Sequence, residues 1–202
     1  SIKAVSDSKL KSIADFDKKY QFHTKEVILV KTERYGYYNL VQKDGTNVIL
    51  DIGLSEVFSH GSNTKEFKKR CLFYKAEVPK AFVGNWKKFD EDDDAEGKAT
   101  ISENGVISTD SDDTDILIAK PLREYLVNKS GKVDNDKVQK EFDKIQKSLK
   151  SHGYQAKSVN DIYHDERSSY YFAVVDGGKR IVILEDSYGD LYSGYIERQD
   201  KD

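Results

Sequence analysis

The chain has 202 residues, of which 37% are hydrophobic and 34% are charged, a length that fits one large domain or two small ones. Its longest uncharged apolar runs, such as 170–175, stop at six residues, whereas a membrane-spanning helix needs about 20. Lys and Arg total 33 against 36 Asp and Glu, and no segment gathers the basic residues. We therefore expect no membrane-spanning segment and no nucleic-acid partner.

The first third of the chain is predicted to hold one helix and about four strands. Apolar residues recur three and four positions apart over 6–20, which predicts a helix. Alternating residues then predict strands at 27–32, 37–43, 47–52 and 69–78. Asp44-Gly45 is a strong hairpin signal between the second and third of these strands.

Cys71 is the single cysteine, so no disulfide can form within the chain. It lies in the strand predicted at 69–78, where we interpret it as a buried, inert thiol rather than a nucleophile. Pro79 follows this strand and marks the predicted domain boundary. We expect residues 1–79 to form a helix-plus-β unit and residues 80–202 to form a second domain.

The second domain is predicted to be mainly antiparallel β. Its opening segment, 81–89, holds the start of the first strand at Gly84-Asn85-Trp86 and precedes an acidic run at 90–96. A hairpin over 98–109 turns at Asn104-Gly105. A strand at 116–119 ends at Pro121. The C-terminal part is predicted to be a meander of three strands, at 170–175, 180–185 and 191–198.

One helix interrupts these strands. Residues 135–151 place apolar side chains 4, 3 and 4 positions apart, and Gly153 is a suitable terminator. The expected apolar face consists of Val138, Phe142, Ile145 and Leu149. The predicted fold class is therefore α+β and mainly β: a helix and antiparallel strands, followed by a barrel or bent sheet with one inserted helix.

Gly84-Asn85-Trp86 at the start of the second domain, with Arg198 near its end, resembles the signature of lipocalin-like (calycin) β-barrels. In that family a Gly-x-Trp begins the barrel and an Arg from the final strand covers the indole. The resemblance implies that Gly84, Trp86 and Arg198 close one end of a barrel, by cation–π contact and hydrogen bonds to carbonyls. The alternative is that Trp86 and Arg198 only brace the fold, without any part in ligand binding.

The phrase Val-Pro-Lys-Ala-Phe-Val-Gly-Asn-Trp (residues 78–86) also resembles the opening of poorly characterised secreted or lipoprotein-type proteins of lactic-acid bacteria and related Gram-positives. The chain contains no Met and starts at Ser1, which a removed leader or a trimmed chain would explain. The resemblance implies an extracellular or cell-surface location, either secreted or lipid-anchored.

The acidic runs 90–96 and 110–115 are rich in oxygen ligands, but neither has the Gly and the terminal Glu of an EF-hand loop. We interpret both as solvated loops, with weak surface calcium binding as the alternative. The histidines at 23, 60, 152 and 164 show no metal-ligand spacing. We expect no metal and no cofactor.

His164, Asp165 and Glu166 form the densest polar cluster, which we interpret as a polar loop. A hydrolase that uses these three residues is the alternative, because catalytic groups can be brought together by folding. No Gly-x-Ser-x-Gly elbow or phosphate loop is present in the sequence. We therefore expect a protein that is not an enzyme.

Tyrosines are unusually frequent on the predicted strands. They serve most often as amphipathic packing residues, and a tyrosine-lined ligand groove is the alternative. The candidate ligand-binding residues are Tyr171, Tyr192 and Tyr195. Strand alternation places Tyr192 and Tyr195 on opposite faces. We expect a non-enzymatic, exported envelope protein that holds a small apolar or amphipathic ligand, or an envelope or protein partner.

Overall fold

The computed structural model describes residues 18, 23–31, 36–43, 46–51, 72–75, 78–103, 105–110, 114–117, 119–165, 169–187 and 189–199. By their contacts the residues divide into two compact units. The first comprises Ser1–Glu77 and Asp113–Ile116, and the second comprises Val78–Asp112 and Leu117–Asp202. The predicted division into domains 1–79 and 80–202 stays a prediction.

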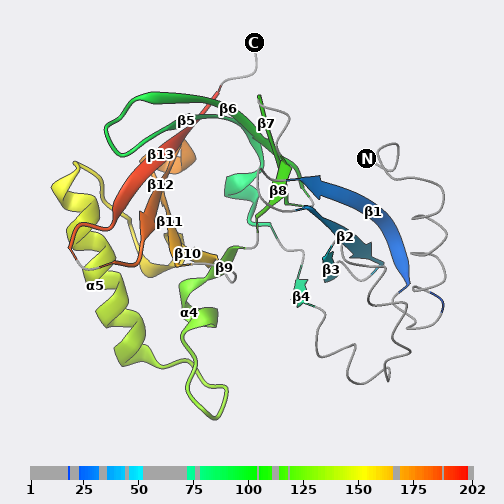
Figure 1. Ribbon diagram of the computed structural model, residues 1–202. Coiled ribbons are helices and arrows are strands. Elements are labelled where there is room, and N and C mark those ends of the chain that lie inside the picture. Colours follow the sequence, from blue (N-terminus) through cyan, green and yellow to red (C-terminus); the bar gives the residue numbers. More distant parts are fainter. Residues whose placement is uncertain are drawn as a thin grey trace. The chain divides into compact units, whose positions relative to one another are not determined.

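The first unit contains an antiparallel sheet in the order β1-β2-β3-β4 (Figure 1). Its strands are β1 (Thr24–Lys31), β2 (Gly36–Gln42), β3 (Thr46–Asp51) and β4 (Leu72–Lys75). β8 (Thr114–Ile116) is grouped with this unit. The Asp44-Gly45 turn, Cys71 and all but Lys18 of the helix predicted over 6–20 lie outside the described residues.

The second unit is built on a curled antiparallel sheet in the order β7-β6-β5-β13-β12-β11-β10-β9 (Figure 1). Its strands are β5 (Gly84–Phe89), β6 (Ala95–Ile101), β7 (Val106–Thr109), β9 (Ala119–Pro121), β10 (Ile162–Asp165), β11 (Tyr170–Val175), β12 (Arg180–Glu185) and β13 (Tyr192–Arg198). Among the described residues, no pairing joins β9 back to β7, so the sheet is a half-barrel. The predicted class, α+β and mainly β, is confirmed.

The inserted helix α5 (Asn135–Ser151) has the predicted bounds. At its start, Asp134 accepts a hydrogen bond from the backbone amide of Lys137, which satisfies one of the free N–H groups of the first turn. At its end, Gly153 has a φ of +82°. There the amide of Gly153 donates to the carbonyl of Lys150, and that of Tyr154 donates to Leu149. This pair of hydrogen bonds is a Schellman motif, which is favoured by glycine at the position that Gly153 occupies.

Four short helical turns complete the second unit. They are η2 (Lys80–Phe82), α4 (Leu122–Tyr125), η3 (Val159–Asp161) and η4 (Asp176–Gly178). η2 precedes β5 directly, and α4 follows β9. A connection of nine residues, 126–134, joins α4 to α5.

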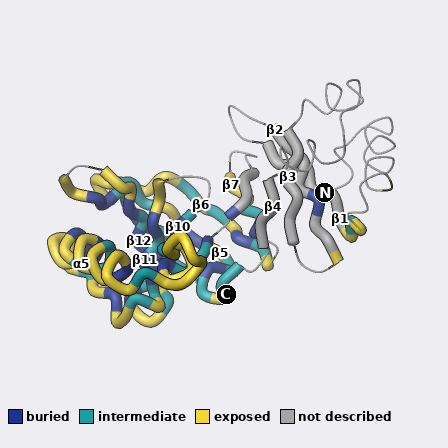
Figure 2. Tube along the Cα trace, turned by 90° about the horizontal axis from the view of Figure 1, so that it is seen from below, coloured by how far each residue is buried: buried dark blue, intermediate teal, exposed yellow. Residues whose placement is uncertain are grey.

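Each face of the curled sheet carries a core of buried residues. The helix-side core packs under α5 and contains Leu122, Ile145, Leu149, Ala156, Ile162, Tyr171, Ala173, Val175, Val182, Leu184, Leu191, Tyr192 and Tyr195. The Trp86-side core contains Phe82, Trp86, Ile101, Leu117, Ala119 and Ile181. In Figure 2, β10, β11 and β12 are mainly buried or intermediate, whereas α5 has an exposed outer side. This is the pattern of strands that alternate between two cores.

Two sequence predictions are wrong in this part of the chain. The single strand predicted at 116–119 is divided between β8 and β9, because the amide of Leu117 turns to donate to the carbonyl of Gly105. The polar loop predicted around His164 is instead strand β10, which contains His164 and Asp165. With only four residues, β10 gives too short an alternation to be distinguished from a loop.

Candidate functional site

Trp86 and Arg198 face each other across the pair formed by β5 and β13. Trp86 is fully buried, and its indole Nε1 donates to the carbonyl of Phe82 at 2.8 Å. The guanidinium carbon of Arg198 lies 4.3 Å from the centre of the Trp86 ring, within the range of a cation–π contact. The contact expected from the lipocalin-like signature is therefore present.

The same guanidinium fastens the chain that leads into β5. Nη1 of Arg198 donates to the carbonyl of Val83 at 2.7 Å, and Nη2 donates to that of Ala81 at 2.6 Å. Gly84 has a φ of +137°, and a β-carbon there would lie 2.5 Å from Nη1 of Arg198. Glycine is thus required at this position for both its backbone conformation and its lack of a side chain.

Aromatic rings contact one another in and beside the Trp86-side core. The ring of Phe82 meets Tyr163 edge-on at 5.2 Å and Phe172 at 5.8 Å. Phe82 is 1% exposed and Trp86 is 0% exposed. The side of the sheet where the resemblance implies a ligand interior is therefore packed with large side chains around Trp86.

The three candidate ligand-binding tyrosines all lie in the helix-side core, and each is less than 9% exposed. The expectation that Tyr192 and Tyr195 face opposite sides of the sheet is wrong. Val182 pairs with Tyr195 and Leu184 pairs with Tyr192, so one residue between these pairs on β12 stands opposite two residues on β13. This β-bulge resets the alternation and brings both rings to one face.

Gly194 makes the bulge possible. Its φ is +111°, and a β-carbon at this position would collide with the carbonyl oxygen of Phe89. The resulting geometry also stacks the ring of Tyr195 on that of Phe89, with centres 4.6 Å apart. Arg180 lies over Tyr195 at 5.2 Å and over Tyr154 at 5.9 Å. The tyrosine side chains therefore pack against neighbours of the fold itself.

A polar cluster joins the end of α5 to the segment before β13. The hydroxyl of Ser148 donates to Oδ1 of Asp190 at 2.5 Å and accepts from the amide of Leu191 at 3.0 Å. Nε2 of His152 lies 2.6 Å from Oδ2 of Asp190. The ring of His152 is stacked on Tyr192, with centres 3.9 Å apart. The sequence does not predict this cluster, because Asp190 lies about 40 residues from Ser148 and His152.

The cluster contains a serine, a histidine and an aspartate, but not in a nucleophilic order. In a catalytic triad the histidine stands between the serine and the acid. Here Asp190 stands between Ser148 and His152. The hydrogen bond from Ser148, followed by that from His152, lowers the pKa of Asp190 from 3.8 to about 2. This arrangement holds a carboxylate in its charged form and does not activate the serine.

Two tyrosine hydroxyls in this core are bonded to carboxylates. Tyr171 donates to Glu141 at 3.1 Å, and Tyr192 donates to Asp93 at 2.6 Å. Burial and the neighbouring carboxylates raise the pKa of both phenols. Both hydroxyls therefore stay protonated and serve as hydrogen-bond donors within the fold.

His164 is 4% exposed and lies between two tyrosine rings. Its ring is stacked on Tyr125 at 3.7 Å and meets Tyr171 edge-on at 4.8 Å. Across the sheet, His164 pairs with Tyr171 of the helix-side core, whereas Asp165 pairs with Ala119 of the Trp86-side core. β10 thus directs His164 and Asp165 to opposite faces. Glu166 lies outside the described residues.

The most exposed large apolar side chains on the described surface include three that are close in sequence. Tyr125 is 42% exposed, Val127 is 44% exposed and Val133 is 41% exposed. They belong to the end of α4 and to the connection that follows it. The sequence predicts no element in this connection, because its alternation covers too few residues to indicate a strand.

Among the described residues, no group of three or more His, Cys, Asp or Glu side chains is arranged to hold a metal ion. No helix in the described part of the chain is long and apolar enough to cross a membrane. In the comparisons with known proteins, no family model, curated protein or solved structure matches the chain.

Proposed function

We propose that this chain is a non-enzymatic, exported binding protein of the bacterial cell envelope, and that it recognises its partner with its outer surface. One observation carries the proposal: a buried apolar core lies on each face of the curled sheet, while apolar side chains are exposed on the connection after α4. Exposed apolar groups of this kind are typical of interaction surfaces. The envelope location rests on the resemblance of residues 78–86 to secreted proteins of Gram-positive bacteria.

The packing around Trp86 favours an outer surface over an enclosed ligand. A pocket for an apolar ligand is normally an open cavity of several hundred cubic ångströms, about 300–1,000 Å³. In this protein the corresponding side of the sheet is occupied by the rings of Phe82, Trp86 and Phe172, which belong to one cluster. The ring of Phe82 contacts that of Phe172. An apolar molecule would have to displace these side chains, at the cost of the contacts that stabilise the fold.

The arrangement of polar groups likewise favours a protein without catalysis. Ser148 donates to Asp190 rather than to a histidine, and His164 and Asp165 face opposite sides of the sheet. A hydrolase would need a nucleophile or a water placed within hydrogen-bond reach of a base. The described residues offer packing and hydrogen-bond roles for these groups instead.

Titration with N-phenyl-1-naphthylamine, an apolar fluorophore that accepts energy from tryptophan, tests the proposal. Trp86 is the only tryptophan, so energy transfer reports on probe bound beside the Trp86-side core. We expect no saturable uptake by the native protein. Saturable binding with quenching of Trp86, lost in an Ala119→Leu variant that overfills this core, would establish an enclosed site and overturn the proposal.

A further inference from the structure

The connection between α4 and α5, residues 126–134, forms a small hairpin that we call the tongue. The amide of Asn128 donates to the carbonyl of Lys132 at 2.7 Å, and that of Asp134 donates to Leu126 at 3.0 Å. Val127 and Val133 form a bridge between these two bonds. Figure 1 shows the tongue extending beyond the ends of α4 and α5. This segment is therefore ordered by its own hydrogen bonds.

A side-chain network fixes the tip of the tongue. Oδ1 of Asn128 accepts hydrogen bonds from the amides of Ser130 and Lys132, both at 3.0 Å, and from the hydroxyl of Ser130 at 2.6 Å. Gly131 has a φ of +77°, which closes the turn. The tip is thus preorganised although residues 127–133 are all exposed. Preorganisation lowers the entropy that binding costs.

The tongue presents apolar groups where a solvent-exposed hairpin normally carries polar ones. Val127 and Val133 are a cross-strand pair, so their side chains lie on one face of the hairpin. Tyr125, just before the tongue, is also exposed, and stacking on His164 holds its ring in place. Valine and tyrosine together suit an interface between water and an apolar phase, where the phenol keeps its hydroxyl hydrated.

The charges at the tip of the tongue are positive. Lys129 and Lys132 lie at its tip, and neither has a carboxylate partner among the residues that the structure describes. The one acidic residue of the tongue, Asp134, lies at its base and accepts a hydrogen bond from the amide of Lys137 to cap α5. Two unpaired lysines beside exposed valines form a surface complementary to an anionic and apolar partner.

We propose that the tongue docks on the surface of a membrane that contains anionic lipids. Val127 and Val133 enter the boundary between headgroups and acyl chains, Tyr125 lies at headgroup level, and Lys129 and Lys132 bind lipid phosphates. A lipid surface suits a small projecting tip, because it needs no complementary groove. This inference rests on the proposed function, since it names the partner for one part of the outer surface.

Sedimentation with vesicles of phosphatidylcholine, with and without phosphatidylglycerol, tests the inference on the full chain. We expect binding only to the anionic vesicles, and weakening with added salt. Lys129→Gln with Lys132→Gln lowers the partition coefficient about twenty-five-fold, about fivefold for each lysine. Lys147→Gln with Lys150→Gln is the matched control, because it removes the same charge from the exposed side of α5 and leaves binding within about twofold.

The apolar contribution is tested separately. Val127→Thr with Val133→Thr keeps both side chains β-branched. The double substitution lowers the partition coefficient about tenfold. A Val127→Trp variant gives a second readout: its emission shifts to shorter wavelength on anionic vesicles and is quenched by brominated lipid. Trp86 is fully buried and supplies a constant background.

Three results would overturn the inference. They are no sedimentation with anionic vesicles, an equal loss in the α5 control, and Val127→Trp emission that vesicles leave unchanged. Binding to poly-glutamate without binding to vesicles would assign the tongue to an acidic protein partner and would also overturn it. Failure of the proposed function has a different sign: saturable uptake of the naphthylamine probe beside Trp86. That result is independent of whether the protein binds vesicles.

Discussion

Because Gly84 has no side chain, the guanidinium of Arg198 can lie directly against its backbone. A β-carbon at position 84 would lie 2.5 Å from Nη1 of Arg198, which binds the carbonyl of Val83 in the same place. The glycine of the Gly-x-Trp signature and the arginine of the last strand therefore form one structural device, although 114 positions separate them along the chain. The cation–π contact with Trp86 depends on this clearance.

Gly84→Ala is expected to lower the free energy of unfolding by about 2–4 kcal/mol, because it adds a clash with Arg198 to the strain of a positive φ. Gly189→Ala is the matched control: Gly189 has a φ of +108°, and a β-carbon there would meet nothing within 4 Å. The control is expected to lose only about 1–2 kcal/mol. Urea unfolding followed by circular dichroism measures both. Equal losses would show that the clash with Arg198 has no energetic weight.

Trp86→Ala is expected to cost about 3–5 kcal/mol, as large-to-small changes of buried aromatic residues do. The indole is fully buried, donates to Phe82 and supports the guanidinium of Arg198. Trp86→Phe keeps a ring but loses the hydrogen bond, so its loss should be smaller. Thermal melts by circular dichroism compare the two variants. A melting temperature of Trp86→Ala equal to that of the wild type would refute the bracing role.

Asp190 is expected to make stability depend on pH between about 4 and about 2. Hydrogen bonds from Ser148 and His152 lower its pKa in the folded state to about 2, below the value near 3.9 of an unfolded chain. The stabilisation is fully present above the unfolded pKa and is lost as the pH falls through the folded one. The side chain is 53% exposed, so after solvent screening the contribution is about 1 kcal/mol.

Asp190→Asn should therefore lower stability at neutral pH and flatten the stability profile between pH values of about 4 and 2. Asp92→Asn, in the exposed turn between β5 and β6, is the control and should leave the profile unchanged. Denaturant midpoints measured across this pH range test the prediction. A wild-type profile that Asp190→Asn leaves intact would mean that the carboxylate is not held by Ser148 and His152.

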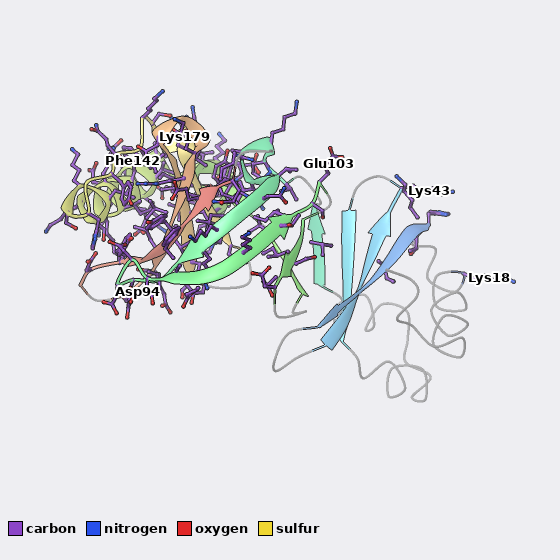
Figure 3. All side chains as sticks on the ribbon, turned by 90° about the horizontal axis from the view of Figure 1, so that it is seen from above. Lys18, Lys43, Asp94, Glu103, Phe142 and Lys179 are labelled. Carbon is purple, nitrogen blue, oxygen red and sulfur yellow. The ribbon has the colours of Figure 1, made fainter. Side chains whose placement is uncertain are left out.

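Calcium is expected to have no structural role in the acidic run 90–96, whose turn is marked by Asp94 in Figure 3. Several of its carboxylates already have partners. Oδ1 of Asp90 accepts from the amides of Asp92 and Asp94, Asp93 binds the hydroxyl of Tyr192, and Glu96 pairs with Lys88 at 3.0 Å. A calcium site needs about 6–8 converging oxygens. Calorimetric titration should show no micromolar binding, and a melting temperature that rises sharply with calcium would contradict this.

Much of the second unit could be predicted from local pattern. α5 follows from apolar residues spaced 4, 3 and 4 apart with a glycine terminator, and β11 and β12 follow from apolar runs on either side of Asp176-Gly177-Gly178-Lys179. These signals lie within one element, so they need no knowledge of distant residues. The first unit gave equally clear hairpin signals, and strands β1, β2 and β3 overlap the predicted ranges within one or two residues at most ends.

What the sequence could not give is the set of relationships between elements. The bulge at Gly194 puts Tyr192 and Tyr195 on one face, because β13 must fit both β12 and the turn after Phe89. β10 is stabilised by pairing with β11, which follows it in the chain, and with β9, which lies about 40 residues earlier.

The amino-acid sequence by itself determined the α5 helix, the meander and the Gly84, Trp86 and Arg198 signature, since periodicity and motif spacing are properties of the chain alone. Only the tertiary structure decided that Ser148, His152 and Asp190 meet, that His164 is buried against Tyr125, and that the tongue exposes Val127. The physical reason is that burial and hydrogen-bond partners depend on which surfaces pack together, and segments remote in sequence supply those surfaces.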